Sequence, residues 1–246
     1  MYAKHIAAIA RTSTVDLHTL PPHAYDSTLP EQLVGHGDSG LLISNFFADS
    51  AVTAEKQGYH AWISAAGQDP GLLAARTRCS IPVVGYGDVV WQAARAEQHR
   101  LGVLGFHPGL REPITANIAA ASAPLARYHV VEHGPELVTR ALNGSFDPLL
   151  NAYSQAAAQA AQAGAQWLVP AEGIVNEIFV HLDLHEIEGL PVIDPGGWAI
   201  KQAEHLCELR SLRIVARPTT GYWRSRTPEP LLERLQQALQ PERTSR

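Results

Sequence analysis

Short β-type runs alternate with Ala-rich helical runs along most of the chain, and no other feature constrains the fold as strongly. Each run typical of a strand is followed by a turn marked by Gly or Pro and then by a helical pattern. Several strand runs are apolar throughout, as strands buried on both faces of a parallel sheet should be. The alternation predicts an α/β fold with doubly wound parallel sheets.

The individual elements follow from these runs. We expect strands at residues 5–10, 61–65, 83–85, 101–106, 128–132, 167–170, 192–194 and 213–216. We expect helices at residues 70–77, 89–99, 112–123, 136–142, 148–163, 176–187, 199–209 and 230–239. The segment 16–40 is rich in Pro, Gly and His, and we expect it to form a long loop or lid.

The sequence also contains an internal echo. Residues 62–67 (WISAAG) resemble residues 167–173 (WLVPAEG) with one residue inserted, and residues 81–85 (IPVVG) resemble residues 190–194 (LPVID). The echo predicts two lobes related by a pseudo-twofold axis. We expect residues 1–100 to form the first lobe, completed by 205–246, and residues 101–204 to form the second.

Ligands of open α/β sheets bind beyond the carboxyl ends of the strands. Two such lobes facing each other would place the loops 64–69 and 170–176 across one cleft. The active site is therefore predicted between these two loops.

Composition excludes several classes of function. The hydrophobic share is 46% and the charged share 17%, which is typical of a globular protein. The net charge of −5 and the scattered basic residues argue against binding to nucleic acid, and no apolar run is long enough to span a bilayer. Neither a dinucleotide fingerprint nor a phosphate-cradling loop is present, so no cofactor is expected.

The two cysteines, Cys79 and Cys207, are not in a metal-type or redox-type spacing. Unpaired thiols and the short apolar run at the N-terminus predict a cytoplasmic protein. Both cysteines are predicted to be ordinary buried thiols.

One region resembles a known family. The segments 66–76 (AGQDPGLLAAR) and 82–85 (PVVG) resemble the first motif of the Asp/Glu/hydantoin racemase superfamily, Cys-x-x-Asp-Pro-Gly-Leu followed by Ala-Arg. Residues 164–168 and 191–194 resemble its second motif region. The resemblance implies two α/β lobes with the active site in the cleft between them, and it implies a homo-oligomer.

Racemases of this superfamily use two cysteines, one from each lobe, to move a proton on and off a carbon next to a carboxylate or amide. At the two corresponding positions the sequence has Ala66 and, with a small alignment shift, Glu172. The resemblance therefore implies the fold and a small-molecule substrate, but not the chemistry of two thiols. We expect a cofactor-independent enzyme that acts on a small carboxylate, amide or cyclic ureide through carboxylate acid/base chemistry. The reaction type stays open between isomerase, carbon–carbon lyase and hydrolase of a ring amide.

Three residues are candidates for catalysis. Glu172 follows an apolar strand, where partial burial would raise its pKa and suit it to general acid or base chemistry. His107 follows the strand run 101–106 and could be its partner. Asp69 matches the family's Asp, although a helix N-cap would explain it equally.

Further candidates would bind the substrate. They are predicted beside the catalytic residues, with backbone N–H groups near Gly67 and Gln68 stabilising negative charge. The set is Ser64, Ala66, Gly67, Gln68, Gly173 and Asp194.

Two alternatives stay open. Glu177, His181 and His185 lie at i, i+4 and i+8 of a predicted helix, so a metal-dependent hydrolase of a ring amide could use them, or His107, together with Glu172. The spacing is not that of a zinc protease motif, and no metal site is assigned. The other alternative is a non-catalytic protein that binds a small ligand, and Glu172 exposed and remote from His107 would favour it. Trp198, Tyr222 and Trp223 are candidates for an oligomer interface.

Overall fold

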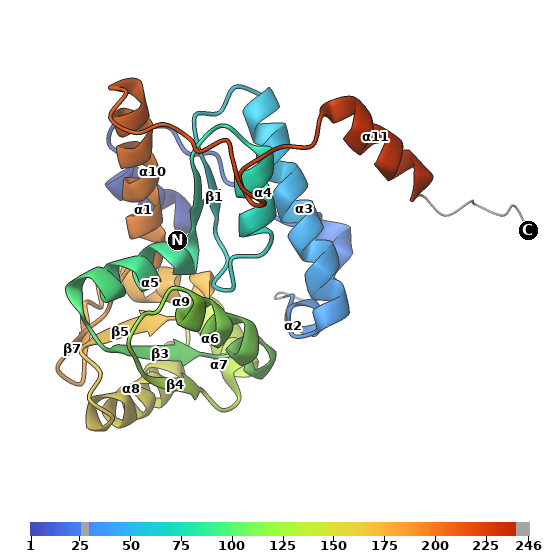
Figure 1. Ribbon diagram of the computed structural model, residues 1–246. Helices are drawn as coiled ribbons and strands as arrows, with labels where there is room; N and C mark the ends of the chain where they lie inside the picture. Colours follow the sequence, from blue (N-terminus) through green and yellow to red (C-terminus); the bar gives the residue numbers. More distant parts are fainter. Residues whose placement is uncertain (26–29, 240–246) are drawn as a thin grey trace, which may run out of the picture.

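Two separate parallel sheets organise the chain in a computed structural model that describes residues 1–25 and 30–239 (Figure 1). The first sheet pairs β1 (Trp62–Ser64) with β2 (Val83–Gly85), and Trp62 lies opposite Val83. The second has the order β4-β3-β5, from Leu125–Val130, Leu101–Gly105 and Trp167–Pro170. The predicted α/β fold with parallel sheets is confirmed.

The helices cover these sheets on both sides. Around the first sheet lie α1, α3, α4 and α10, around the second lie α6, α7, α8 and α9, and α5 lies between the two groups (Figure 1). Their bounds are α1 Tyr2–Ile9, α3 Gly37–Lys56, α4 Leu72–Arg78, α5 Tyr86–Glu97, α6 Arg111–Ala120, α7 Gly134–Leu142, α8 Asp147–Gln162, α9 Gly173–His181 and α10 Pro195–Ser211. The smaller elements are η1 Pro22–Ala24, α2 Glu31–Val34, η2 Pro108–Leu110, β6 Glu186–Ile187, β7 Leu190–Pro191 and α11 Glu229–Ala238.

One hydrophobic cluster joins the two parallel sheets. It combines Val84 of β2, Val90 of α5, Val103 of β3 and Ala199 of α10, all fully or almost fully buried. Each Å² of apolar surface that this cluster removes from water stabilises the fold by roughly 25 cal/mol. This cluster therefore holds the loops that follow β1 and β5 at fixed positions relative to each other.

The N-terminal segment differs from its prediction. Residues 5–10 were expected to form a strand, but residues Tyr2–Ile9 form α1. Tyr2, Ile6 and Ile9 have the helical spacing i, i+4, i+7, and the alanines among them have high helix propensity. The short apolar run was therefore ambiguous, and the helical period was the correct one.

Other boundaries were also wrong. The 20-residue helix α3 begins at Gly37, inside the expected loop 16–40, of which residues 26–29 lie outside the described part. Residues 213–216 form no strand, and Arg213 has a left-handed φ of 58°. Residues 192–194 contribute a single bridge, Val192 to Leu168, because Pro191 and Pro195 on either side lack the N–H donors that a ladder needs.

In the described part of the chain, no helix combines the length and the apolar character that a membrane crossing requires.

Candidate active site

The loops that follow β1 and β5 touch each other. A Cβ on Gly67 would lie 1.7 Å from the carbonyl oxygen of Ala171, so the glycine is required for this approach. A Cβ on Gly173 would lie 3.5 Å from the carbonyl oxygen of Ala65 and 3.4 Å from the hydroxyl of Tyr2. The predicted juxtaposition of loops 64–69 and 170–176 is thus present in the structure.

Glu172 is buried, with 7% of its surface exposed, at the carboxyl ends of β5 and β3. Its two carboxyl oxygens each accept a hydrogen bond from the Phe106 N–H at 3.2 Å, and Oε1 also accepts one from the His107 N–H at 3.2 Å. Burial raises the pKa of Glu172 to about 8, against the opposing effect of the His107 and Phe106 N–H groups. Glu172 is therefore mostly protonated at neutral pH.

Two buried tyrosines, Tyr128 and Tyr153, feel the charge of this carboxyl. A Cβ on Gly105 would lie 2.5 Å from the Tyr128 hydroxyl and 3.2 Å from Glu172 Oε1, so both groups converge on the bare face of that glycine. Burial, and then the charge of Glu172, raise the pKa of Tyr128 and of Tyr153. Within the described chain, neither tyrosine hydroxyl has a hydrogen-bond partner. The cluster is a low-dielectric site in which a neutral carboxylic acid is favoured.

His107 contributes its backbone N–H to Glu172, and its ring lies against Gly109 and Gly35. Nδ1 of the ring accepts a hydrogen bond from the Gly109 N–H at 3.1 Å, and a Cβ on Gly35 would lie 2.4 Å from the ring. The segment 34–36 therefore packs on the end of β3, as a lid would. The structure brings Glu172 and His107 together through a main-chain contact.

Asp69 lies at the other end of its loop and caps a helix. Its carboxylate accepts hydrogen bonds from the N–H groups of Gly87 at 3.2 Å and Asp88 at 2.7 Å, at the start of α5. The helix that we expected it to cap starts later, with Gly71 as its N-cap. Burial raises the pKa of Asp69 to about 8, and the Asp88 N–H opposes the shift. Both carboxyl oxygens therefore hold the loop against the start of α5.

The remaining substrate-binding candidates border the same junction. Ser64 ends β1 with its hydroxyl buried, and that oxygen has no hydrogen-bond partner among the described residues. The carbonyl of Gln68 accepts a hydrogen bond from Asn117 of α6 at 2.8 Å, and the carbonyl of Ala66 closes a turn to the Asp69 N–H at 2.9 Å. These bonds fix the course of the first loop.

Asp194 belongs to a buried polar network that the sequence did not predict. His5 of α1 contacts Glu177 through Nδ1 at 2.7 Å and Asp194 through Nε2 at 2.8 Å. Asn176 donates to Asp194 at 2.8 Å, and so does the Gly197 N–H at 2.9 Å. The network ties α1 to α9 and α10.

The electrostatics of the network favour its charged form. Hydrogen bonds to Asp194 and then to Glu177 raise the pKa of His5 to about 10, although burial lowers it. Burial raises the pKa of Asp194, but the bonds from His5, Gly197 and Asn176 bring it below its ordinary value. The ring is therefore a cation held between carboxylates, with both nitrogens donating.

The predicted alignment of Glu177, His181 and His185 on one helix face was wrong. Helix α9 ends at His181, and His185 lies beyond it, exposed and bonded to Asp183 at 2.9 Å. Glu177 points to His5 instead. In the part of the chain that the structure describes, no three His, Cys, Asp or Glu side chains are grouped as metal ligands.

The cysteines lie away from the site. Cys79 is buried beside α3 and β2, where burial raises its pKa to about 11. Cys207 is only half-buried, contrary to our prediction, and lies within hydrogen-bonding distance of the carbonyl of His60 at 3.4 Å.

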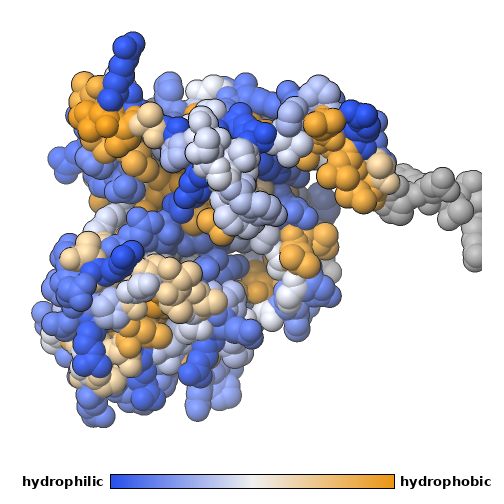
Figure 2. Space-filling model, viewed as in Figure 1, coloured by the Kyte–Doolittle hydropathy of each residue, from blue (hydrophilic) through white to orange (hydrophobic). Residues whose placement is uncertain are grey.

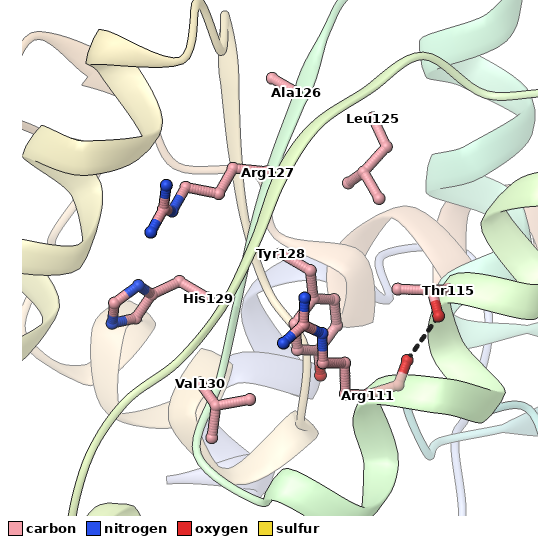
Figure 3. A pocket seen from close by; sticks show the side chains of 8 residues that line it. All are labelled: Arg111, Thr115, Leu125, Ala126, Arg127, Tyr128, His129 and Val130. Carbon is pink, nitrogen blue, oxygen red and sulfur yellow. Dashed lines mark hydrogen bonds between the residues drawn. The ribbon is translucent and has the colours of Figure 1, made fainter.

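A separate cavity of about 570 Å³ runs along β4 (Figure 3). Figure 3 shows Arg127 and His129 on one side of the strand and Arg111 and Thr115 on the other. Its lining also includes Tyr128, whose hydroxyl lies close to Glu172 on the inner side. This basic cavity therefore borders the candidate site without opening between the two loops.

Comparisons with solved structures give the same fold. The chain is similar to allantoin racemase from Klebsiella pneumoniae, with 18% identity, a TM-score of 0.62, and coverage of 78% of this chain and 76% of that one. It is also similar to glutamate racemase RacE1 from Bacillus anthracis, with 16% identity, a TM-score of 0.51, and coverage of 72% and 68%. A liganded double mutant of arylmalonate decarboxylase matches with 15% identity, a TM-score of 0.50, and coverage of 78% and 84%. At these identities the likeness shows the fold alone.

Among curated protein sequences there is no significant match. The family model described as Asp/Glu/hydantoin racemase matches residues 2–203, which is most of the chain. This match, together with the two parallel sheets, identifies the family. The chain belongs to the Asp/Glu/hydantoin racemase family.

Proposed function

We propose that this protein is a cofactor-independent enzyme with a single acid, Glu172, and that it acts as a lyase on a small carboxylate, amide or cyclic ureide. The observation that carries the proposal is the buried carboxyl of Glu172 at the ends of β3 and β5, whose pKa of about 8 keeps it protonated at neutral pH. A general acid works best when its pKa lies near the operating pH. Glu172 meets that condition.

The position of a racemase's second acid/base group holds no ionisable side chain, and the nearby Asp69 has both carboxyl oxygens bonded to the start of α5. β1 begins at Trp62 and β5 at Trp167, and the fourth residue after each tryptophan is an alanine, Ala66 or Ala171. Glu172 is therefore one residue beyond the position that mirrors Ala66. Proton transfer from both faces of a carbon needs a group on each side, whereas delivery of one proton to a carbanion needs a single acid. The asymmetry favours lyase chemistry.

The step balances with one acid. In a substrate that bears a carboxylate on the reacting carbon, the bond between that carbon and the carboxylate breaks, carbon dioxide leaves, and the electron pair stays on the carbon. The O–H of Glu172 then donates its proton to that carbon, and the resulting carboxylate regains a proton from water. Backbone N–H groups near Gly67 and Gln68 and the hydroxyl of Ser64 are our candidates for stabilising the negative charge.

The other candidates receive supporting roles in this proposal. Asp69 positions the first loop against α5, and Asp194 holds α1, α9 and α10 together rather than contacting substrate. His107 positions Glu172 through its N–H. Because Gly67 contacts Ala171, we propose that the loops separate to admit the substrate.

A cytoplasmic location fits the two free thiols, Cys79 and Cys207. A metal-dependent hydrolase is disfavoured by the separation of Glu177 from His185, and a non-catalytic protein by the burial of Glu172 against the His107 N–H.

The proposal is tested with a panel of small carboxylates, amides and cyclic ureides incubated in D₂O. We expect release of carbon dioxide together with one deuterium on the reacting carbon, followed by NMR. Exchange at an intact carbon centre, with interconversion of enantiomers and no cleavage, would contradict the lyase assignment. Binding of panel members without turnover would favour the non-catalytic alternative.

The pH profile is a second test. With Glu172 acting as an acid, kcat/KM should be constant below pH 8 and fall tenfold per pH unit above it, because only the protonated form donates. A profile that instead rises through pH 8 would show that the ionised group acts as a base. The profile is measured with the panel member turned over fastest.

A further inference from the structure

Strand β4 lies at the edge of the second sheet and has a partner strand on one side. The order of that sheet is β4-β3-β5, and among the residues that the structure describes β4 pairs with β3 alone. An edge strand presents a row of N–H and C=O groups that can pair with another extended chain. The outer edge of β4 can therefore serve as a template for an added strand.

The backbone groups on this outer edge follow from the pairing with β3. Val131, just after β4, donates its N–H to the carbonyl of Gly105 at 2.8 Å. Because successive residues of a strand direct their backbone groups to opposite edges, every second residue over 127–131 faces β3. The N–H and C=O groups of Tyr128 and Val130 then face away from the sheet. A donor and an acceptor thus recur along this edge, as an added strand requires.

The cavity of about 570 Å³ follows this edge. All six residues of β4, Leu125–Val130, line it, together with Arg111 and Thr115 of α6. Six residues of a strand span about 20 Å. Figure 3 shows side chains on both sides of the strand, with Arg127 on one side and Arg111 on the other. A groove that runs along a whole strand has the shape of an extended peptide.

The groove is basic. Its lining includes Arg111, Arg127 and His129 but no Asp or Glu, although the whole chain has 24 acidic residues against 19 Lys and Arg. Arg127 donates to the neutral side-chain amide of Gln159 at 2.9 Å. Neither arginine forms an ion pair with a carboxylate within the described part of the chain. The groove therefore carries positive charge that its own chain does not neutralise.

The pKa of His129 responds to this charge. Burial and then the charge of Arg127 lower the pKa, and Arg111 acts in the same direction against the opposing charge of Glu132. The ring is therefore neutral at neutral pH, and the two arginines supply the charge of the groove.

A second copy of this chain does not fit this edge. Pairing the same edge of two copies would bring Arg111 and Arg127 of both into one groove, and like charges opposite each other are destabilising. Figure 2 shows mainly hydrophilic surface over the lower end of the molecule, where β4 lies in Figure 1. Permanent subunit interfaces are more hydrophobic than this. An extended chain that carries carboxylates meets no such repulsion.

We propose that the outer edge of β4 binds an extended acidic segment of a partner protein, which adds a strand to the sheet and places carboxylates beside Arg127 on one face and Arg111 on the other. Main-chain hydrogen bonds to Tyr128 and Val130 supply affinity, and the two arginines select acidic side chains. This binding does not depend on the chemistry of Glu172.

The test uses the full chain, labelled with nitrogen-15, and a capped octapeptide of alternating glutamate and threonine. In an NMR titration at low ionic strength, the N–H resonances of Tyr128 and Val130 should shift. Exchange of these two amides with solvent should slow roughly tenfold at saturation, because the added strand protects them. A peptide with lysine in place of every glutamate should not bind. A fully N-methylated form of the octapeptide keeps the carboxylates but cannot form the ladder, so it should bind roughly tenfold more weakly.

Charge-reversal variants test the arginines. Arg111→Glu and Arg127→Glu should each weaken binding of the octapeptide roughly tenfold, because each places a carboxylate in the groove. Both residues are exposed, and an acidic residue is favourable in the first turn of α6, so the fold should be retained. Arg11→Glu is the matched control, because it makes the same change at an exposed residue just beyond α1, beside the first sheet (Figure 1). It should leave the affinity unchanged, and far-UV circular dichroism should be the same for all variants.

Three results would overturn the proposal. The first is no binding of the octapeptide at millimolar concentration, or shifts that leave Tyr128 and Val130 unaffected. The second is equal binding of the N-methylated peptide, which would show attraction between charges without an added strand. The third is binding of inorganic phosphate as tight as that of the octapeptide, which would show that the groove recognises small anions instead.

Discussion

Glu172→Gln should slow turnover by about 10²–10⁴-fold, the range associated with loss of a general acid. Glutamine keeps the size of the side chain, and its carbonyl oxygen can still accept from the N–H groups of Phe106 and His107. Because Glu172 is mostly protonated at neutral pH, replacing it with a neutral amide should preserve the fold. The measurement is kcat/KM on the panel member that the wild-type enzyme turns over, with unfolding followed in parallel.

The matched control for this variant is Glu112→Gln, an exposed residue in the first turn of α6. It makes the same chemical change away from the site and should leave kcat/KM unchanged. Near-normal turnover by Glu172→Gln in a protein of normal stability would exclude Glu172 as the acid.

The second large effect is expected on stability. His5→Ala should lower the free energy of unfolding by about 3–5 kcal/mol, because it leaves the carboxylates of Glu177 and Asp194 next to each other without their cation. The side chains of His5 and Glu177 are each only 4% exposed, so water cannot replace the lost partner. Helix α1 should loosen first, since His5 is its buried residue. Urea unfolding measures the change.

Two features identify the network as the cause. Adding Glu177→Gln to His5→Ala should recover part of the loss, because it removes one of the two stranded charges. The contribution of His5 should be fully present below pH 6.5 and should disappear as pH rises through about 10, since the folded state holds its proton more tightly than the unfolded state. A loss that is independent of pH and unaffected by the second substitution would point to packing alone.

The sequence predicted the parts of the fold in which local pattern and tertiary structure agree. The strands that begin at Trp62 and Trp167 were expected because they are apolar and bounded by turns, and the loops that follow them meet as expected. Glu172 was selected as a candidate for the same reason, since a carboxyl that follows a buried strand lies at the carboxyl edge of a sheet. Its burial and its bond to the His107 N–H support the selection made from position alone.

The buried network could not be predicted in the same way. His5 is 172 positions from Glu177 and 189 positions from Asp194 in the sequence, and no local signal links it to them. The apolar run around His5 suggested a strand, so the helix that points its ring inward was missed. Glu177 was grouped with His181 and His185 because the end of α9 could not be located from the sequence. Long-range pairing of polar groups depends on tertiary packing, which periodicity does not encode.

The most direct test of Glu172 as a general acid is its pKa in the folded protein. Carbon-13 NMR of the glutamate side-chain carboxyl groups, assigned by comparing the wild-type spectrum with that of Glu172→Gln, gives it without knowledge of the substrate. We expect a titration midpoint near pH 8 for this carboxyl. A midpoint near 4.5, the value of an ordinary glutamate, would contradict the claim that Glu172 is a buried acid ready to donate a proton.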